Sequence, residues 1–545
     1  MAAAGSALSQ VIRTSFSEWR GRDWPRDRSL LHAKLMLHCD DHLPNLADAT
    51  MVNDLRRRFD LRRRFLERLH VMTQAQAERG SLALNGKGRV CAGRLAAVLL
   101  GALTLAWPAF YNGFPLLYPD SMTYLDDGRI VARAVFLRQF SDYYGMRSFF
   151  YSLGILPLHW NVALWPVVAG QCLLAAYVLW LAVRSIAPRQ TILAYLVLVL
   201  PLSLFTGISW YSALIMPDIL GPLLYLSIYL LVFARDSLTR GERLSLYPIA
   251  WWAVASHATH LLLAAGMCVI LALLAAAGRR DFRRRIRPVC EVAAIVALAA
   301  AAQLALHGYL YGTPSLDGER PPFLTARIIA DGPGRWYLEK HCGDLKWVIC
   351  DHLHNLPNDP DDFLWGENGV YQNLSDSDNS RLMQEEIPFV LATLRAYPRQ
   401  QISQSAANFW GQLITFDFAD LHASSWVLDE FEPVLPHARS SYLKSRQARN
   451  ALHLNLFSAI QFWAVMVSLA AIAAFVPLLW RRHSARIAGL SVVVVSMVVG
   501  NALVTGVLSM VEGRFECRVI WLIPFLAGMC VLDWRTALSG APEAS

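Results

Sequence analysis

The sequence predicts an all-α polytopic membrane protein with about ten transmembrane helices and a long outer loop domain. The chain has 545 residues, of which 55% are hydrophobic and 17% charged, and its mean hydropathy is +0.33. A soluble chain of this length is normally less apolar and more charged. About ten apolar stretches are suited to crossing a bilayer. Arginine clusters fall on one side of them only, which is typical of cytoplasmic loops.

The polar segment at residues 1–88 is expected to be a cytoplasmic extension. It contains no short apolar core followed by a cleavage site, so we expect no signal peptide. Its arginine runs at 56–58 and 62–64 also suit a helix that lies on the membrane surface. The formal net charge is +8, and many arginines flank apolar stretches. We therefore interpret this charge as topology charge and expect no nucleic-acid partner.

Residues 89–308 are expected to hold seven spans, with a first outer loop at about 113–160. The spans lie at about 92–112, 161–183, 190–207, 216–234, 289–308 and, as two short helices, within 247–277. Arginines flank both ends of the 247–277 stretch, so both ends should be cytoplasmic. This stretch is long for one span and short for two. We therefore expect two short helices that turn near residues 256–260.

The long loop at 309–455 is expected to fold as an outer domain. Enough aromatic surface for a small core comes from Trp336, Trp347, Trp365, Trp410 and Trp426. The stretch at about 383–415 has the pattern of an amphipathic helix broken at Pro398. Cys342 and Cys350 are close in sequence, and on an oxidising side of the membrane we expect them to form a disulfide.

Three further spans are expected within residues 456–535, at about 456–480, 487–510 and 518–533. Arg481, Arg482 and Arg486 lie between the first two and place that connection inside. A cytoplasmic tail follows at 536–545. Both termini are therefore expected in the cytoplasm.

This threading brings polar residues from distant parts of the chain to the outer face. Ionisable groups at membrane depth are costly and are functional candidates by default. The run Tyr118–Ser121 follows the first span and has Asp120 near its centre. Asp218 lies at the outer mouth of the fourth span. Either aspartate could instead cap a helix.

Four basic residues complete the candidate site. His257 and His260 are spaced i, i+3, so one helix face can present both. Two histidines without further ligands do not make a metal site, so we assign no metal ligand, and a divalent cation stays open as a cofactor. Arg514 and Arg518, spaced i, i+4, suit an anionic phosphate. With the two nearby glutamates they could equally form a plain salt-bridge cluster.

This pattern resembles the GT-C superfamily of integral membrane glycosyltransferases, which includes the protein mannosyltransferase and aminoarabinose transferase group. The resemblance begins with a first span followed by a tyrosine-flanked acidic residue in an outer loop. The other similar stretches are Arg147–Pro157, running into Val167–Gln171, for the start of the second helix, and Leu394–Pro398 followed by Asn408 for the long outer loop. Two features depart from the family. Many relatives have Asp-Glu or Glu alone at the position of Asp120, and the long outer segment here lies between spans seven and eight.

The resemblance implies transfer of a sugar from a polyprenyl-phosphate-linked donor at the outer face of a bacterial inner membrane. The acceptor would be an envelope glycan, lipid or protein. Asp120 would act as general base on the acceptor hydroxyl, and cationic groups would stabilise the leaving phosphate. Substrate contacts would fall to Tyr118, Ser121, Asp218, His257, His260, Arg514 and Arg518. A lipid-linked donor needs no nucleotide site, and the sequence has no P-loop or Rossmann fingerprint.

Two other classes of protein stay open. A membrane transporter or flippase for a lipid-linked or envelope glycan would share the topology, but the sequence lacks the internal repeat and paired broken helices that many transporters show. A non-catalytic envelope assembly protein would use the long loop for partners. Substitution of Asp120 distinguishes an enzyme from a scaffold, because an enzyme needs this residue and a scaffold tolerates its loss.

Overall fold

The computed structural model describes residues 92–141, 147–277, 282–316, 320–482 and 484–538. The expectations for the 1–88 extension and for most of the 536–545 tail lie outside these residues. Within them, the secondary structure is helical apart from one isolated bridge between Leu116 and Leu214. The all-α class predicted from the sequence is confirmed for this part of the chain.

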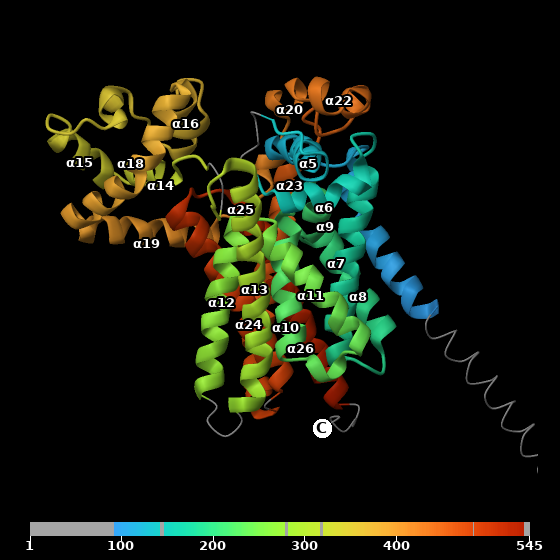
Figure 1. The fold of residues 1–545 in the computed structure, drawn as a ribbon. Coiled ribbons are helices and arrows are strands. Elements are labelled where there is room, and N and C mark those ends of the chain that lie inside the picture. The colour runs from blue at the N-terminus through green and yellow to red at the C-terminus, as the bar shows by residue number, and fades with distance from the viewer. Residues whose placement is uncertain (1–91, 142–146, 278–281, 317–319, 483, 539–545) are drawn as a thin grey trace, which may run out of the picture. The chain divides into compact units, whose positions relative to one another are not determined.

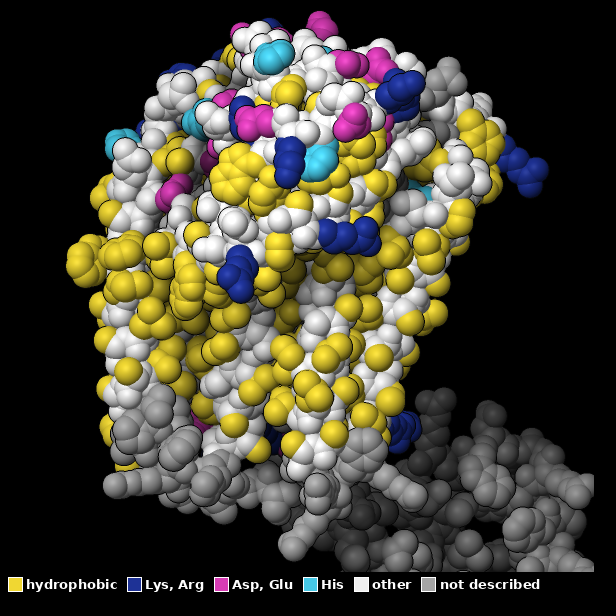
Figure 2. All heavy atoms as spheres, turned by 90° about the vertical axis from the view of Figure 1, so that its left-hand side faces the viewer, with side chains coloured by type: hydrophobic (Ala, Val, Ile, Leu, Met, Phe, Trp, Pro, Cys, Tyr) yellow, Lys and Arg dark blue, Asp and Glu magenta, His cyan; other side chains and the backbone are white. Residues whose placement is uncertain are grey.

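Seven helices in the described ranges are long and apolar enough to cross a membrane. They are Ala92–Asn112, α7 (Trp165–Ile186), α12 (Ala258–Ala277), α13 (Phe282–Tyr311), α23 (Leu454–Arg482), α24 (Ala485–Leu508) and the consecutive pair α25 (Gly513–Ile520) and α26 (Leu522–Leu538). Each coincides with an expected span. Hydrophobic side chains cover the flank of this bundle, whereas charged side chains gather at one end (Figure 2). The chain is therefore an all-α membrane protein.

The other three expected spans form shorter helices. They are α8 (Thr191–Phe205), the 3-10 turn η1 (Pro217–Ile219) with α10 (Leu220–Val232), and α11 (Arg240–Ala255). α8 and the η1–α10 segment are apolar but short, and α11 begins with a polar turn. α10 is buried on nearly all sides, so its apolar surface packs against protein. Length and composition thus support seven spans, and the count of ten stays a prediction.

The 247–277 stretch breaks where the sequence predicted. α11 ends at Ala255 and α12 begins at Ala258, so the turn falls inside the predicted 256–260 segment. The Tyr247 hydroxyl, in the middle of α11, donates to Glu291 in the first third of α13 at 2.6 Å. α11 packs against both α12 and α13, and the chain turns between α11 and α12.

The first outer loop contains two helices that pack against each other, α5 (Pro119–Leu137) and α6 (Phe149–His159). α5 follows Tyr118, whose N–H donates to Ser121 Oγ at 2.9 Å. Pro119 occupies the first helical position, where its missing N–H costs nothing. This start brings Asp120 into the first turn of α5.

The long loop forms two packed parts rather than the single domain expected at 309–455. The first part has its own apolar core, built by α14 (Phe323–Ala330), α15 (Pro333–His341), α16 (Pro360–Trp365) and α18 (Asp376–Ala396). The expected Cys342–Cys350 disulfide lies in this part. Residues 416–442, by contrast, pack into the core of the membrane bundle. They include the short helices α20 (Ser425–Asp429), α21 (Phe431–Val434) and α22 (Arg439–Leu443).

α19 (Pro398–Ile414) joins the two parts of the long loop. It begins at Pro398, directly after α18, so the expected helix at 383–415 is broken at the predicted residue. Figure 1 shows the helices of the long loop gathered with α5 at one end of the bundle, which we call the outer end. The other end holds ion pairs such as Arg184–Glu242 and Arg235–Glu291, made by arginines that the sequence placed in the cytoplasm.

Candidate functional site

Asp120 is held in an ion pair and does not cap its helix. Tyr118 is the N-cap residue of α5, so Asp120 lies inside the helix. An Arg147 guanidinium N–H donates to Asp120 Oδ1 at 2.5 Å, and both side chains are largely buried. Among the described residues, Asp120 Oδ2 has no hydrogen-bond donor. One carboxylate oxygen thus stays open at the outer end of the bundle.

Ser121 has a local structural role. Its side chain is fully buried, and its hydroxyl accepts the Tyr118 N–H that begins α5. The Ser121 N–H donates to the Tyr118 carbonyl at 2.8 Å. These contacts fix the turn that carries Asp120, so Ser121 positions the turn, and its predicted contact with substrate stays a prediction.

Arg514 lies against the same turn, although it comes from the last span. Its guanidinium stacks 3.8 Å above the centre of the Tyr118 ring. Its backbone N–H donates to Asp420 at 3.1 Å, and the Tyr211 hydroxyl donates to its carbonyl at 3.1 Å. Two guanidinium nitrogens, Nε and Nη1, are buried without a hydrogen-bond partner in the part of the chain that the structure describes. Arg514 therefore keeps donors free for an anion.

The guanidinium of Arg518 forms more contacts with protein acceptors than that of Arg514 does. Its Nη1 lies 3.3 Å from Asp218 Oδ1, and both side chains are only 2% exposed. Its Nη2 donates to Asn501 Oδ1 at 2.9 Å. Asp218 therefore forms a buried ion pair and caps no helix, and Arg518 has a structural partner set. These contacts favour Arg514 over Arg518 as the ligand for an anion.

The two glutamates near these arginines do not neutralise them fully. Glu512 Oε2 lies 3.9 Å from Arg514, at the limit of an ion pair. Glu516 is fully buried and accepts a hydrogen bond from Asn501 at 2.9 Å. The plain salt-bridge cluster weighed from the sequence is thus only partly formed, because Glu512 makes a long pair with Arg514 and the closer pair of Arg518 is with Asp218.

Glu512 is a largely buried titratable group beside Arg514. Burial raises the pKa of its carboxyl to about 7, with Arg514 lowering it and Asp420, Asp361 and Asp120 raising it further. A carboxyl surrounded by other carboxylates takes up a proton near neutral pH. The charge facing Arg514 therefore changes in the physiological pH range.

The two histidines lie together at the turn between α11 and α12. Their ring centres are 5.3 Å apart. Burial lowers the pKa of His257 well below its usual range, and His260, Arg518 and Arg147 lower it further. His260 Nδ1 pairs with the Ala253 carbonyl at 2.8 Å, and its Nε2 has no partner among the described residues. A neutral His257 offers a polar ring near the arginines, not a second cation.

Polar and charged groups from four distant segments therefore meet at one place. α5, η1, the α11–α12 turn and α25 each supply at least one residue predicted from the sequence. Within the described ranges, no group of three or more potential metal ligands is present. Sequence reasoning did not assign Arg147, Glu512 or Asp420 to the site. All three are charged residues in segments predicted to lie at the outer face, and this was the signal that could have found them.

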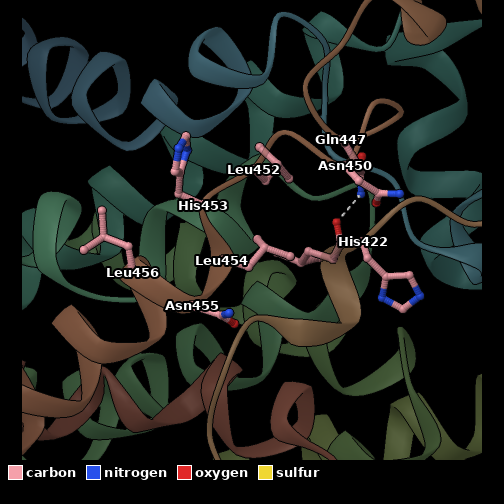
Figure 3. A pocket seen from close by; sticks show the side chains of 9 residues that line it. His422, Gln447, Asn450, Leu452, His453, Leu454, Asn455 and Leu456 are labelled. Carbon is pink, nitrogen blue, oxygen red and sulfur yellow. Dashed lines mark hydrogen bonds between the residues drawn. The ribbon is translucent and has the colours of Figure 1, made fainter.

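A cavity of about 480 Å³ lies beside this cluster, at the junction of the long loop with α23. It is lined by Leu421, His422, Gln447, Asn450, Leu452, His453, Leu454, Asn455 and Leu456 (Figure 3). Its polar lining consists of amides and imidazoles. The Gln447 amide holds both the N–H and the carbonyl of Leu117, at 3.1 and 2.7 Å. The cavity wall is thus tied to the turn that carries Asp120.

The arrangement is suited to moving a proton and stabilising an anion at the membrane surface. Asp120 has an open carboxylate oxygen, and Arg514 has unpaired donors on a guanidinium that stacks on Tyr118. Transfer of a group to a hydroxyl acceptor requires a general base and a group, such as a guanidinium, that stabilises the leaving anion. Comparisons with protein-family models, with curated proteins and with solved structures find no match.

Proposed function

We propose that this protein is a GT-C-like membrane glycosyltransferase that uses a polyprenyl-phosphate-linked sugar donor. The acceptor is an envelope glycan, lipid or protein at the outer face of a bacterial inner membrane. The observation that carries the proposal is the meeting of Asp120 and Arg514 around Tyr118 at the outer end of the bundle. A donor with a polyprenyl tail would present its phosphate at this depth.

In the proposed reaction, Asp120 Oδ2 accepts the proton of the acceptor hydroxyl. The hydroxyl oxygen then attacks the anomeric carbon of the sugar. The bond between that carbon and the phosphate oxygen breaks, and its electron pair leaves with the polyprenyl phosphate. Arg514 stabilises this leaving anion through its two unpaired nitrogens. Arg147 holds the carboxylate of Asp120 in place throughout.

The protonation state of Glu512 regulates anion binding at Arg514. When ionised, it competes with a phosphate for Arg514, 3.9 Å away. When protonated, it leaves the guanidinium to the ligand. Because the pKa of Glu512 lies at about 7, donor binding is expected to weaken as the pH rises through neutrality.

The test compares Asp120→Asn with the matched variant Asp126→Asn. Asp126 lies on the same helix, α5, and is also paired with an arginine, Arg129, at 2.6 Å. Purified protein in lipid is offered polyprenyl-phosphate hexoses and pentoses with envelope acceptors, and mass spectrometry detects the product. Asp120→Asn should lower turnover by roughly 10²–10⁴-fold, the usual scale for a lost general base. Asp126→Asn should retain it.

Three outcomes oppose the proposal. Wild-type turnover in Asp120→Asn removes this residue as the base. Movement of the lipid-linked sugar between leaflets without a glycosylated product supports the transporter or flippase. A chain that binds envelope components but neither transfers nor moves a sugar supports the assembly protein.

A further inference from the structure

α19 has its polar and apolar faces arranged the opposite way round from a helix on a soluble protein. Gln401, Asn408 and Gln412 are buried. Ile402, Trp410 and Ile414 are 66%, 61% and 72% exposed. The exposed residues recur every four or eight positions, so they form one stripe along the helix. A large apolar stripe with buried amides behind it needs an apolar environment outside the protein.

Hydrogen bonds fix the rotation of α19 about its own axis. Gln401 and Asn408 donate to the Asp331 carboxylate at 2.6 and 2.8 Å. Gln412 donates to the Glu512 carbonyl at 2.8 Å and accepts the Glu512 N–H at 3.0 Å. These bonds hold both ends of the helix. The apolar stripe therefore cannot turn inward without breaking the buried amide contacts.

The stripe is continuous with the apolar flank of the membrane bundle. α19 packs against the outer end of α24, where a Cβ on Gly506 would lie 2.8 Å from the Asn408 carbonyl oxygen. Leu503 and Leu508 of α24, near this contact, are 52% and 41% exposed. α19 runs across the direction of α12 and α24 (Figure 1). It is thus placed at the level where the apolar flank ends.

α19 also borders water-accessible space along its first turns, where Gln400 and Gln404 lie to one side of the apolar stripe. A groove of about 380 Å³ is lined by Asp331, Pro333, Trp336, Arg399, Gln400, Ser403 and Gln404. α19 accordingly separates a polar groove from an apolar stripe. Tryptophan is enriched at membrane–water interfaces, and Trp410 lies in the stripe.

We infer that α19 is an in-plane interfacial helix, seated on the outer leaflet of the bilayer that the bundle spans. Ile402, Trp410 and Ile414 insert at the boundary between headgroups and acyl chains. Gln400 and Gln404, which line the groove, face the aqueous side. α19 is hydrogen-bonded to Asp331 and to Glu512. Its contact with lipid therefore fixes how far Asp331 and Glu512 lie above the membrane. The inference does not depend on the chemistry proposed for the site.

The experiment uses single cysteines labelled with an environment-sensitive fluorophore in the full-length chain. The test positions are 402 and 410, and the matched controls are 400 and 404, which line the groove on the same helix. Every other cysteine outside the Cys342–Cys350 disulfide is replaced. The protein is reconstituted in phosphatidylcholine vesicles with or without lipids brominated on the acyl chains. Iodide serves as the aqueous quencher.

Labels at 402 and 410 should lose at least half of their fluorescence to brominated lipid and should resist iodide. Labels at 400 and 404 should show the reverse. Equal iodide quenching at all four positions would place the stripe in water and overturn the inference. Protection of 402 and 410 from both quenchers would indicate a second copy or another protein on the stripe, which also overturns it.

A second measurement needs no substitution. A phospholipid with a photoreactive diazirine in its acyl chain is added to vesicles of the wild-type protein and activated by light. Peptide mapping should find the lipid attached within 401–414. Attachment to the membrane helices, with none in this peptide, would contradict the inference.

Discussion

Replacing Arg518 by methionine should destabilise the protein and leave donor binding largely unchanged. Arg518 and Asp218 are 3.3 Å apart and each is 2% exposed, so removing the arginine leaves a buried carboxylate without its partner. Asn501 also loses the hydrogen bond that its side-chain oxygen receives from Arg518. The expected effect is thus on folding rather than on the ligand.

The magnitude follows from the geometry of the pair. Coulomb's law with an effective dielectric constant of about 20 gives an attraction of about 5 kcal/mol for unit charges at this separation. Desolvation of both ions offsets much of that when the intact pair is compared with two neutral side chains. Breaking one partner of such a pair nevertheless lowers the free energy of unfolding by roughly 3–5 kcal/mol. Asp218→Asn combined with Arg518→Met removes both charges and should recover part of this loss.

The assay measures reversible unfolding in mixed detergent for wild type, both single variants and the double variant. Arg381→Met serves as the control, because Arg381 and Asp378 form an exposed surface pair. That variant should change stability by no more than about 1 kcal/mol. If Arg518→Met is as stable as Arg381→Met, or if the effects of Asp218→Asn and Arg518→Met simply add, the two buried charges are not coupled and the reasoning fails.

Three further predictions concern the outer end of the protein. Glu512 has a pKa of about 7 in the folded chain, above its ordinary 4.5, so its contribution to stability is present below pH 4.5 and is lost as the pH rises towards 7. In wild type the free energy of unfolding should therefore fall by about 1.4 kcal/mol per pH unit over this range, and Glu512→Gln should remove this slope. An unchanged slope in the variant contradicts the raised pKa. Serine at Cys342 should lower stability modestly, by about 2–3 kcal/mol on the loop-entropy model, and peptide mapping of the wild type that finds free thiols would refute the disulfide. Cysteine at the exposed Ala258 should react with an impermeant maleimide in intact cells, and labelling only after lysis would place the α11–α12 turn inside.

Much of the fold followed from two patterns, apolar length and the side on which arginines lie. Both are local properties, which explains why every described long apolar helix coincides with a predicted span. The break within 247–277 was predicted in the same way, from arginines at its two ends. The division of the long loop was not predictable, because whether a segment joins the bundle core depends on packing partners far away in sequence. Phe431 and Tyr442, for example, pack into the bundle core, whereas Phe389 belongs to the separate core.

The candidate site shows the same limit. The predicted topology placed Asp120, Asp218 and the arginines at one membrane face, but it could not show which aspartate pairs with which arginine. The sequence neighbours of Arg518 are glutamates, yet its partner is Asp218, 300 positions away. The inverted faces of α19 were equally hidden, because an amphipathic pattern does not reveal whether protein or lipid covers its apolar side.

The pairing of charges at the outer end argues for a ligand at one residue in particular. A buried charge is tolerated when another group satisfies it, and Arg147 and Arg518 each have an aspartate for this purpose. Arg514 has instead an aromatic face and a glutamate at the limit of contact, whose own pKa of about 7 makes it neutral in part of the physiological range. Its two remaining nitrogens are buried and have no partner among the described groups. Such a guanidinium is costly unless an anion completes it, which is why the proposal assigns the donor phosphate to Arg514 and a supporting role to Arg518.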